Sequence, residues 1–215
     1  MRDLVKSYFE DNSIVNHHIA SFNDFLASAD NLNSRMQKIV DDIRVPNEDA
    51  ERGVIVLDKD RVGNQEIKIR IGRKRDEEGK ISSKTKGTIR VGSPEVNEAN
   101  GYRHTITPME ARLRNLNYSS PIFLDFTIIP PTGAEQEEND VYIGNLPMMV
   151  KSRGCNLCYE AVREQKRKET GIDELSEEEY LQRLIDAKED PRDSGGYFII
   201  GGTERVLITD RKSVV

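Results

Sequence analysis

The sequence contains no tryptophan, only two cysteines and no long uninterrupted apolar run. A membrane-spanning helix needs about 18 consecutive apolar residues, so the sequence predicts no such helix. The opening stretch MRDLVKSYFEDN lacks the apolar core of a signal peptide. Because Cys155 and Cys158 are too few for a disulfide framework, the sequence predicts a cytoplasmic location.

Charge is plentiful but unevenly distributed along the chain. The net charge of −6 argues against a simple nucleic-acid-binding protein. Residues 59–90 nevertheless carry 11 Lys/Arg against 5 Asp/Glu, whereas residues 160–193 carry 12 acidic against 7 basic residues. Such asymmetry fits two surfaces that face different partners, and it also fits two stretches that are merely solvated.

The hydrophobic periodicity of the first half changes from helical to extended. Residues 2–10 and 14–27 are predicted to be helical, the second with Val15, Ile19, Phe22 and Leu26 on one face and a cap at Asn12 or Ser13. A weaker helical pattern follows with Leu32, Met36, Ile39 and Val40. Strands are expected at 54–57, 66–71 and 88–91, and the polar stretch 73–87 between the last two is predicted to be mobile.

The second half alternates strands with short capped helices. Thr107, Pro108 and Glu110 predict a helix start with a capping box, followed by a strand at 122–129. An acidic loop at 135–140 is expected before the next extended stretch at 141–150. Helices are predicted at 160–168 and 176–188, and residues 195–208 form a tight hairpin around two glycines. The fold class is therefore α+β, with N-terminal helices packed on mixed or antiparallel sheets and a boundary near 150–155.

The sequence shows no self-contained active site. Cys155 and Cys158 have the spacing of half a zinc site, but two reduced thiols in a loop are the simpler interpretation. The glycine pairs at 195–196 and 201–202 match no phosphate-binding loop. Arginine suits both phosphate and carboxylate, so Arg112, Arg114 and Arg205 are candidates either for nucleic-acid contact or for ion pairs within the domain.

Three stretches share a more specific pattern, and we call them the first, second and third motif segments. They are residues 100–121, containing PMEARLRNLNYSSP; residues 143–152, IGNLPMMVKS; and residues 195–208, GGYFIIGGTERVLI. Together, in this order, they closely resemble segments of the second-largest (B or beta-type) subunit of DNA-directed RNA polymerases of the archaeal and eukaryotic type. The residue before the second glycine of the hairpin, usually asparagine in that family, is Gly201 here.

The resemblance implies a fold and a function. It places residues 1–153 in the protrusion domain, 154–194 in a helical start of the lobe domain or an inserted segment, and 195–215 in hairpin strands returning to the sheet core. The family's enzyme is a nucleotidyltransferase that makes RNA from ribonucleoside triphosphates. This chain is expected to supply a structural part that faces the DNA cleft, to be inactive alone, and to belong to a subunit that continues for several hundred residues beyond Val215.

The resemblance also implies roles for particular residues. Glu204 and Arg205 are expected to face the RNA–DNA hybrid, and no catalytic or metal-binding residue is expected here. Structural roles are expected for Glu110, Arg112, Arg114, Tyr118, Gly144, Pro147, Gly195, Gly196 and Gly202.

The expected cofactors and partners also come from the resemblance. Magnesium is expected in the whole enzyme, bound mainly by its largest subunit, with no cofactor in this segment. Other polymerase subunits, template DNA, the hybrid and general initiation factors are the implied partners. The alternative interpretation is a free-standing adaptor that shares the fold and binds proteins through its acidic residues 160–193.

Overall fold

The computed structural model describes residues 14–27, 32–43, 52–57, 67–75, 80–81 and 86–208. The chain divides into two compact units. The first comprises Met1–Asn23, Ser93–Ser120 and Leu146–Val215, and the second comprises Asp24–Gly92 and Pro121–Asn145. The α+β fold class is confirmed, because both helices and antiparallel sheets are present. The domain limits given by the resemblance stay predictions.

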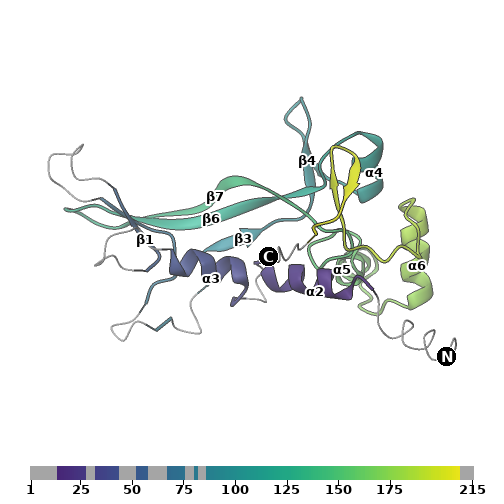
Figure 1. The fold of residues 1–215 in the computed structure, drawn as a ribbon, viewed down its shortest axis with the longest axis horizontal. Helices are drawn as coiled ribbons and strands as arrows, with labels where there is room; N and C mark the ends of the chain where they lie inside the picture. Colours follow the sequence, from purple (N-terminus) through teal and green to yellow (C-terminus); the bar gives the residue numbers. More distant parts are fainter. Residues whose placement is uncertain are drawn as a thin grey trace, which may run out of the picture. The chain divides into compact units, whose positions relative to one another are not determined.

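The second unit is built on a five-stranded sheet. Its strands are β1 (Val54–Val56), β2 (Lys68–Arg70), β3 (Ile89–Val91), β6 (Ser119–Ile129) and β7 (Gln136–Pro147). The order is β1-β2-β6-β3, and β7 also pairs with β6. Figure 1 shows β6 and β7 as the two long strands of this sheet. The pairings of β1 with β2, and of β6 with β2 and β3, are antiparallel, for example Ile69 opposite Ile128 and Ile89 opposite Leu124.

Helix α3 (Arg35–Asp42) packs against β3 through a face that is partly polar. Ser34 caps the helix, since its hydroxyl accepts a hydrogen bond from the Gln37 amide at 3.2 Å. Gln37 is buried together with Met36 and Val40, whereas Ile39 is 59% exposed. The prediction that Ile39 lies on the apolar, buried face was therefore wrong. The side of α3 that carries Gln37 faces the sheet instead, because the Gln37 carboxamide forms hydrogen bonds with the start of β3.

The Gln37 carboxamide replaces a missing strand partner at the start of β3. Its Oε1 atom accepts hydrogen bonds from the backbone amides of Thr88 and Ile89, at 2.8 and 3.2 Å. Its Nε2 atom donates to Asp41 Oδ1 at 3.0 Å. Asp41 in turn forms a buried ion pair with Arg73, 2.7 Å between Oδ2 and Nη2. Helix α3 is thus held to the sheet by a satisfied polar network as well as by apolar contact.

The predicted acidic loop at 135–140 was wrong, because β7 already begins at Gln136. The strand is irregular at Asp140, whose φ is +58°. Arg90 stabilises this position: its Nη2 donates to Asp125 Oδ1 at 2.8 Å and also contacts Asp140. The Asp140 amide donates to Asp125 Oδ1 at 2.8 Å. Ion pairs between neighbouring strands therefore allow β7 to extend into a segment whose acidic composition favours a loop.

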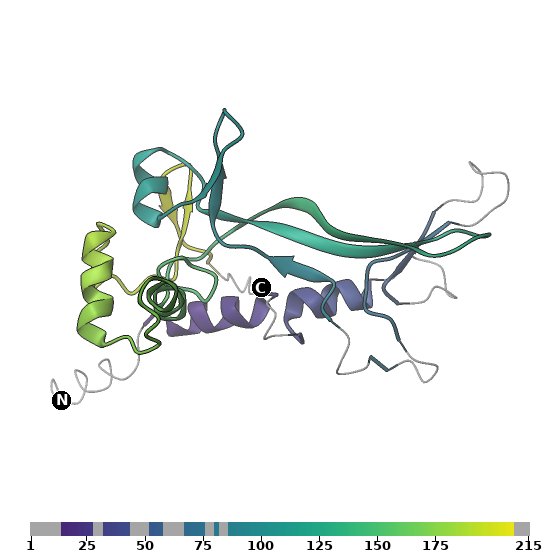
Figure 2. The same ribbon diagram turned by 180° about the vertical axis from the view of Figure 1, so that it is seen from behind.

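The first unit contains the remaining short elements. They are the hairpin β4 (Glu95–Asn97) and β5 (Arg103–Thr105), helices α4 (Pro108–Leu113), α5 (Tyr159–Thr170) and α6 (Glu177–Asp186), and the hairpin β8 (Phe198–Ile200) and β9 (Thr203–Arg205). The β4–β5 hairpin was not predicted from the sequence. Figure 2, which shows the fold from behind, makes the second hairpin visible beside α4. The core of the first unit includes Ile106, Ala111, Tyr118, Met148 and Ile199, each at most 1% exposed.

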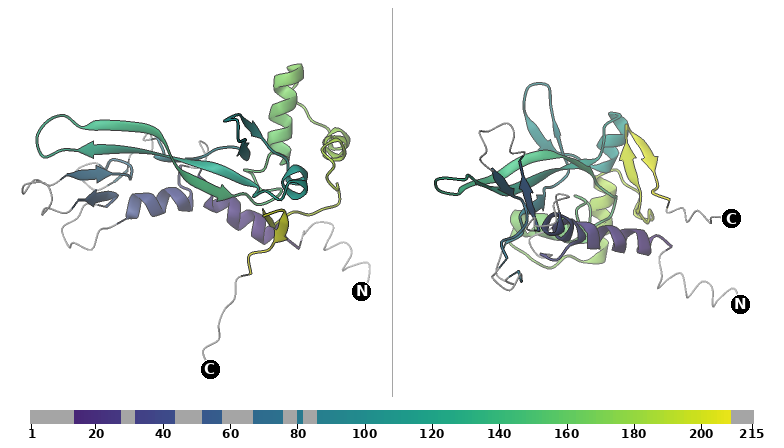
Figure 3. Two further views of the ribbon diagram at one scale, coloured as in Figure 1. Left: turned by 90° about the horizontal axis from the view of Figure 1, so that it is seen from above. Right: turned by 60° about the vertical axis from the view of Figure 1, so that its left-hand side comes forward.

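The helices begin where the sequence indicates. Thr107 caps α4, since its hydroxyl accepts from the Glu110 amide at 3.2 Å. The capping box predicted there was wrong, because the Glu110 carboxylate binds Arg114 and His104 instead of the backbone of Thr107. Ser176 and Glu179 form the full capping box of α6. In Figure 3, α5 and α6 run in clearly different directions. Within the described ranges, no helix combines the length and apolar character that crossing a membrane requires.

The first long helical prediction is confirmed as α2 (Asn16–Phe25). The helix predicted at 2–10 and the caps proposed at Asn12 and Ser13 lie outside the described residues. Most of the stretch predicted to be mobile, including 76–79 and 82–85, lies outside them as well. That mobility stays a prediction.

Candidate nucleic-acid interface

Tyr118 is the point at which the three motif segments meet. Its amide donates to the carbonyl of Ile199 at 2.9 Å, and its carbonyl accepts from the amide of Met148 at 2.8 Å. Its side chain is fully buried, and its hydroxyl accepts from the Asn156 amide at 3.0 Å and lies 3.3 Å from the sulfur of Cys155. The pKa of Tyr118 is raised by burial, so this hydroxyl stays neutral and acts as a structural hydrogen-bonding group.

The turn of the β8–β9 hairpin rests on the end of α4. Gly201 and Gly202 have φ values of +57° and +73°, which suit a two-residue turn. The Gly202 amide donates to the Leu116 carbonyl at 3.0 Å, and the Gly201 amide donates to Asn117 Oδ1 at 2.7 Å. A Cβ on Gly202 would lie 2.7 Å from Asn115 Oδ1, whereas one on Gly201 would meet nothing within 4 Å. Only the second glycine is thus required by close packing.

Gly195 and Gly196 position the strand that enters the hairpin. Their φ values are +71° and +83°, and a Cβ on Gly195 would come within 2.6 Å of the Val150 carbonyl oxygen. The Gly196 amide donates to that same carbonyl at 3.0 Å, and the Val150 amide donates to Tyr197 at 2.8 Å. The second and third motif segments therefore lie backbone to backbone, and a larger residue at 195 would separate them.

Arg112 joins the first motif segment to the hairpin by side-chain contacts. Its Nη1 atom donates to both carboxylate oxygens of Glu189, at 3.0 and 2.9 Å. Its Nε atom donates to Glu204 at 2.9 Å and its Nη2 atom to the Tyr197 hydroxyl at 2.6 Å. The Arg112 and Glu189 side chains are only 18% and 7% exposed. A planar guanidinium with donors on several edges can bind three acceptors at once, which an ammonium group does less well.

The electrostatics of this cluster follow from burial and from the two carboxylates. Burial lowers the pKa of Arg112, but the hydrogen bonds to Glu189 and Glu204 and the charge of Glu189 outweigh it, and the net shift is upward. Burial raises the pKa of Glu189 despite the neighbouring guanidinium. The pKa of Tyr197 is raised by burial and by its hydrogen bond to Asp193. Arg112 is therefore always charged, and it is the cation that keeps these acidic groups together.

Glu204 and Arg205, the two residues expected to face nucleic acid, differ in their surroundings. Both lie in β9, every residue of which is exposed. Glu204, 54% exposed, is held by Arg112. In the part of the chain that is described, the Arg205 side chain has neither a hydrogen bond nor an ion pair. The hairpin therefore presents one tethered carboxylate and one guanidinium available to an outside acceptor.

Arg114 lies on the other side of α4 and makes a separate cluster. It pairs with Glu98 at 2.7 Å and with Glu110 at 2.8 Å, while His104 lies 3.3 Å from Glu110. The hydrogen bond from Arg114 is the leading cause that lowers the pKa of both Glu98 and Glu110. This cluster connects the β4–β5 hairpin to α4 and has no unpaired cation to offer a phosphate.

The two cysteines are free, buried thiols. Cys158 caps α5, its sulfur accepting from the Ala161 amide at 3.4 Å. Burial raises the pKa of Cys158 to about 12 and raises that of Cys155 as well. Metal ligation needs the thiolate, which these surroundings disfavour. The described residues include no group of three or more His, Cys, Asp or Glu side chains arranged to hold a metal ion.

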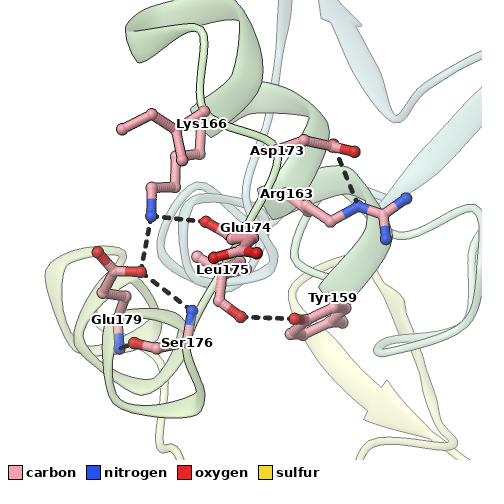
Figure 4. Close-up of a pocket in the computed structure, with 9 residues that line it drawn as sticks. Tyr159, Arg163, Lys166, Asp173, Glu174, Leu175, Ser176 and Glu179 are labelled. Atoms are coloured by element: carbon pink, nitrogen blue, oxygen red, sulfur yellow. Dashed lines mark hydrogen bonds and ion pairs between the residues drawn. The ribbon is translucent and has the colours of Figure 1, made fainter.

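The hollow between α5 and α6, about 600 Å³ in volume, is lined by residues that mostly bind one another. Figure 4 shows Lys166 contacting both Glu179 and the carbonyl of Glu174, and Tyr159 donating to Leu175. These contacts close the α5–α6 connection. Some of the acidic side chains in residues 160–193 are thus paired with basic side chains of the same unit.

Sequence reasoning missed the partners of Arg112. Glu189 and Tyr197 lie 77 and 85 positions along the chain from it, and Glu189 sits in an acidic stretch that composition assigns to solvent. The other predicted structural positions, Gly144 and Pro147, lie in β7. A single sequence carries no signal for such long-range pairs.

The chain is similar to subunits of archaeal RNA polymerases. It is 36% identical over 212 residues to the DNA-directed RNA polymerase subunit Rpo2N of Methanocaldococcus jannaschii, covering 97% of this chain and 32% of that subunit. For Rpo2N of Halobacterium salinarum the identity is 35% over 216 residues, covering 97% and 31%. For Rpo2 of Saccharolobus solfataricus it is 34% over 207 residues, covering 96% and 13%.

The chain thus spans about a third of the length of the Rpo2N relatives and a smaller part of Rpo2. The sequence profile described as "RNA polymerase beta subunit" matches residues 13–214. That range includes all three motif segments and the residues that bind them together. Because the match covers nearly the whole sequence, this chain belongs to the RNA polymerase beta subunit family.

Proposed function

We propose that this chain is part of a DNA-directed RNA polymerase, a nucleotidyltransferase that transcribes DNA into RNA from ribonucleoside triphosphates. Within that enzyme it serves as a scaffold and as a surface facing the nucleic acid, and it has no activity alone. Family membership supports the assignment, as do relatives named DNA-directed RNA polymerase subunits.

The observation that carries the nucleic-acid role is the contrast between Arg112 and Arg205. Arg112 is held by Glu189, Glu204 and Tyr197, and the two carboxylates neutralise its charge, so it is poorly placed to bind a phosphate. Arg205 extends from an exposed strand whose turn is fixed by two hydrogen bonds to Leu116 and Asn117, just after α4. A guanidinium without an internal partner is available to phosphate. Because hydrogen bonds already fix the hairpin turn, binding has to order the Arg205 side chain but little of the backbone.

We further propose that catalysis resides in other subunits. Magnesium would supply charge stabilisation for phosphoryl transfer in the whole enzyme. The donor set described here does not fit such an ion, since its carboxylates are paired with arginine or lysine or are dispersed. We assign the metal mainly to the largest subunit.

We place the chain in the cytoplasm, in the protrusion and the start of the lobe. Other polymerase subunits, template DNA and the RNA–DNA hybrid are its proposed partners, and initiation factors are further candidates. The adaptor alternative is not favoured, because the relatives named above are polymerase subunits.

The test is Arg205→Ala in the assembled polymerase, with elongation complexes challenged by increasing salt. Losing one phosphate contact should weaken retention and reduce the slope of log affinity against log salt by about one. The matched control is Arg167→Ala, which removes an exposed arginine of α5 that pairs with Glu164. Equal salt stability of the Arg205→Ala and parent complexes would refute the nucleic-acid role.

A further inference from the structure

Strand β7 forms an unusually long free edge of the sheet in the second unit. Among the described residues it pairs only with β6, and Figure 1 shows it on the side of β6 away from β1 and β3. It has 12 residues, whereas β1 and β3, the ends of the strand order, have three each. An edge of this length presents a row of unpaired amides and carbonyls, which another strand can use.

Two large apolar side chains on this edge are open to solvent. Tyr142 is 52% exposed and Ile143 is 53% exposed. Successive side chains of a strand point to opposite faces, so both faces are uncovered at this place. Tyr142 also contacts the Phe123 ring edge-on, with 6.3 Å between centroids, and is thereby held in place. Exposed apolar residues on a long edge favour aggregation unless a partner covers them.

The first half of β7 carries acidic side chains. Glu137 and Glu138 are exposed, and neither has an ion-pair partner among the described residues. Asp140 differs, because Arg90 binds it. Two unpaired like charges disfavour pairing of this edge with a second copy of itself, and they repel a phosphate backbone.

We propose that the outer edge of β7 binds an extended, basic segment of a partner protein by strand addition. Its backbone supplies hydrogen bonds, Glu137 and Glu138 select lysine or arginine, and Tyr142 and Ile143 pack against apolar residues of the added strand. Charge complementarity is what distinguishes this occupant from a second copy or a nucleic acid. These residues of β7 are separate from the hairpin of β8 and β9, so binding at this edge does not depend on the role of the hairpin.

The test uses a labelled ten-residue peptide with lysines in one half and valines in the other, which matches the acidic and apolar halves of the β7 edge. Its binding to the purified protein is followed by fluorescence anisotropy. Glu137→Lys/Glu138→Lys should weaken binding by about tenfold or more. The matched control is Glu178→Lys/Asp186→Lys on α6, which makes the same charge change at two exposed positions and should leave binding unchanged. Circular dichroism confirms that each variant keeps its fold.

A second arm changes only the peptide and therefore cannot disturb the protein. Methylating every other backbone amide removes one hydrogen-bonding edge while keeping the charges, and it should also weaken binding by about tenfold. Equal binding of the methylated peptide would mean simple charge attraction and would overturn the proposal. Three other results would also overturn the proposal. The first is unchanged binding of the peptide to Glu137→Lys/Glu138→Lys, and the second is no binding of either peptide. The third is self-association of the parent protein that is lost in the Glu137→Lys/Glu138→Lys variant.

Discussion

Arg112 binds both carboxylate oxygens of Glu189, at 3.0 and 2.9 Å, although 77 positions separate the two residues. The same guanidinium holds Glu204 of the hairpin. The contact lies inside the first unit and links α4, the segment after α6 and β9. The orientation of the exposed hairpin strand therefore depends on an ion pair that is mostly removed from water.

Replacing Arg112 should therefore be costly. Arg112→Ala leaves the 7%-exposed Glu189 carboxylate without its cation, and breaking a buried pair in this way costs roughly 3 kcal/mol. Arg114→Ala removes a more exposed arginine, the C-cap residue of the same helix, and should cost clearly less. Urea unfolding of the two variants measures the difference, and equal losses would show that the Arg112 cluster is not specially stabilising.

The two glycines of the hairpin turn should respond differently. Gly202→Ala places a Cβ 2.7 Å from Asn115 Oδ1 at a φ of +73°, so we expect a loss of more than about 1 kcal/mol. Gly201→Asn should be tolerated, because its Cβ would meet open space and asparagine accepts left-handed backbone. Thermal unfolding of both variants tests this; a larger loss at 201 than at 202 would contradict the turn geometry.

The Glu98–Arg114–Glu110 cluster should make stability depend on acidity. The hydrogen bond from Arg114 lowers the pKa of Glu110 from its ordinary 4.5, while burial opposes the shift and His104 adds to it. Because the folded-state pKa is depressed, the stabilisation is present above pH 4.5 and is lost as the pH falls through the folded-state value. The stability difference between the parent and Glu110→Gln should shrink over that range. A constant difference from pH 6 to about pH 2 would exclude this coupling.

Gln37 should tolerate no apolar substitute, although it lies on a buried helix face. Gln37→Met would remove the oxygen that accepts a hydrogen bond from the Thr88 amide at 2.8 Å and another from the Ile89 amide at 3.2 Å. We expect a loss of roughly 2 kcal/mol or more, the cost of an unsatisfied buried donor. Lys38→Met, one position along and exposed, is the control. If both variants unfold at the same urea concentration, the network does not stabilise the sheet.

Local patterns predicted most elements, and long-range contacts explain the exceptions. The caps at Thr107 and Ser176 and the Gly201–Gly202 hairpin follow from residue types a few positions apart. The strand at 136–140 could not be predicted, because Arg90 stabilises an acidic stretch that by itself favours a loop.

The burial of Gln37 has the same kind of cause, since the backbone amides that donate to its Oε1 atom, those of Thr88 and Ile89, lie at the start of β3, 51 and 52 positions away. The residues of the candidate site also fall into a predictable and an unpredictable group. The motif segments and Arg205 could be identified in the sequence, whereas Glu189 and Tyr197 could not, because nothing near them marks them as partners of Arg112.

The most direct test of the central claim is to place a photo-cross-linking amino acid at position 205 of the assembled polymerase and illuminate a stalled elongation complex. We predict cross-links to the RNA or DNA strands of the hybrid. The same group at Glu178, exposed on α6, is the comparison and should yield fewer. Cross-links from position 205 to protein alone, in an active complex, would show that this hairpin does not face the nucleic acid.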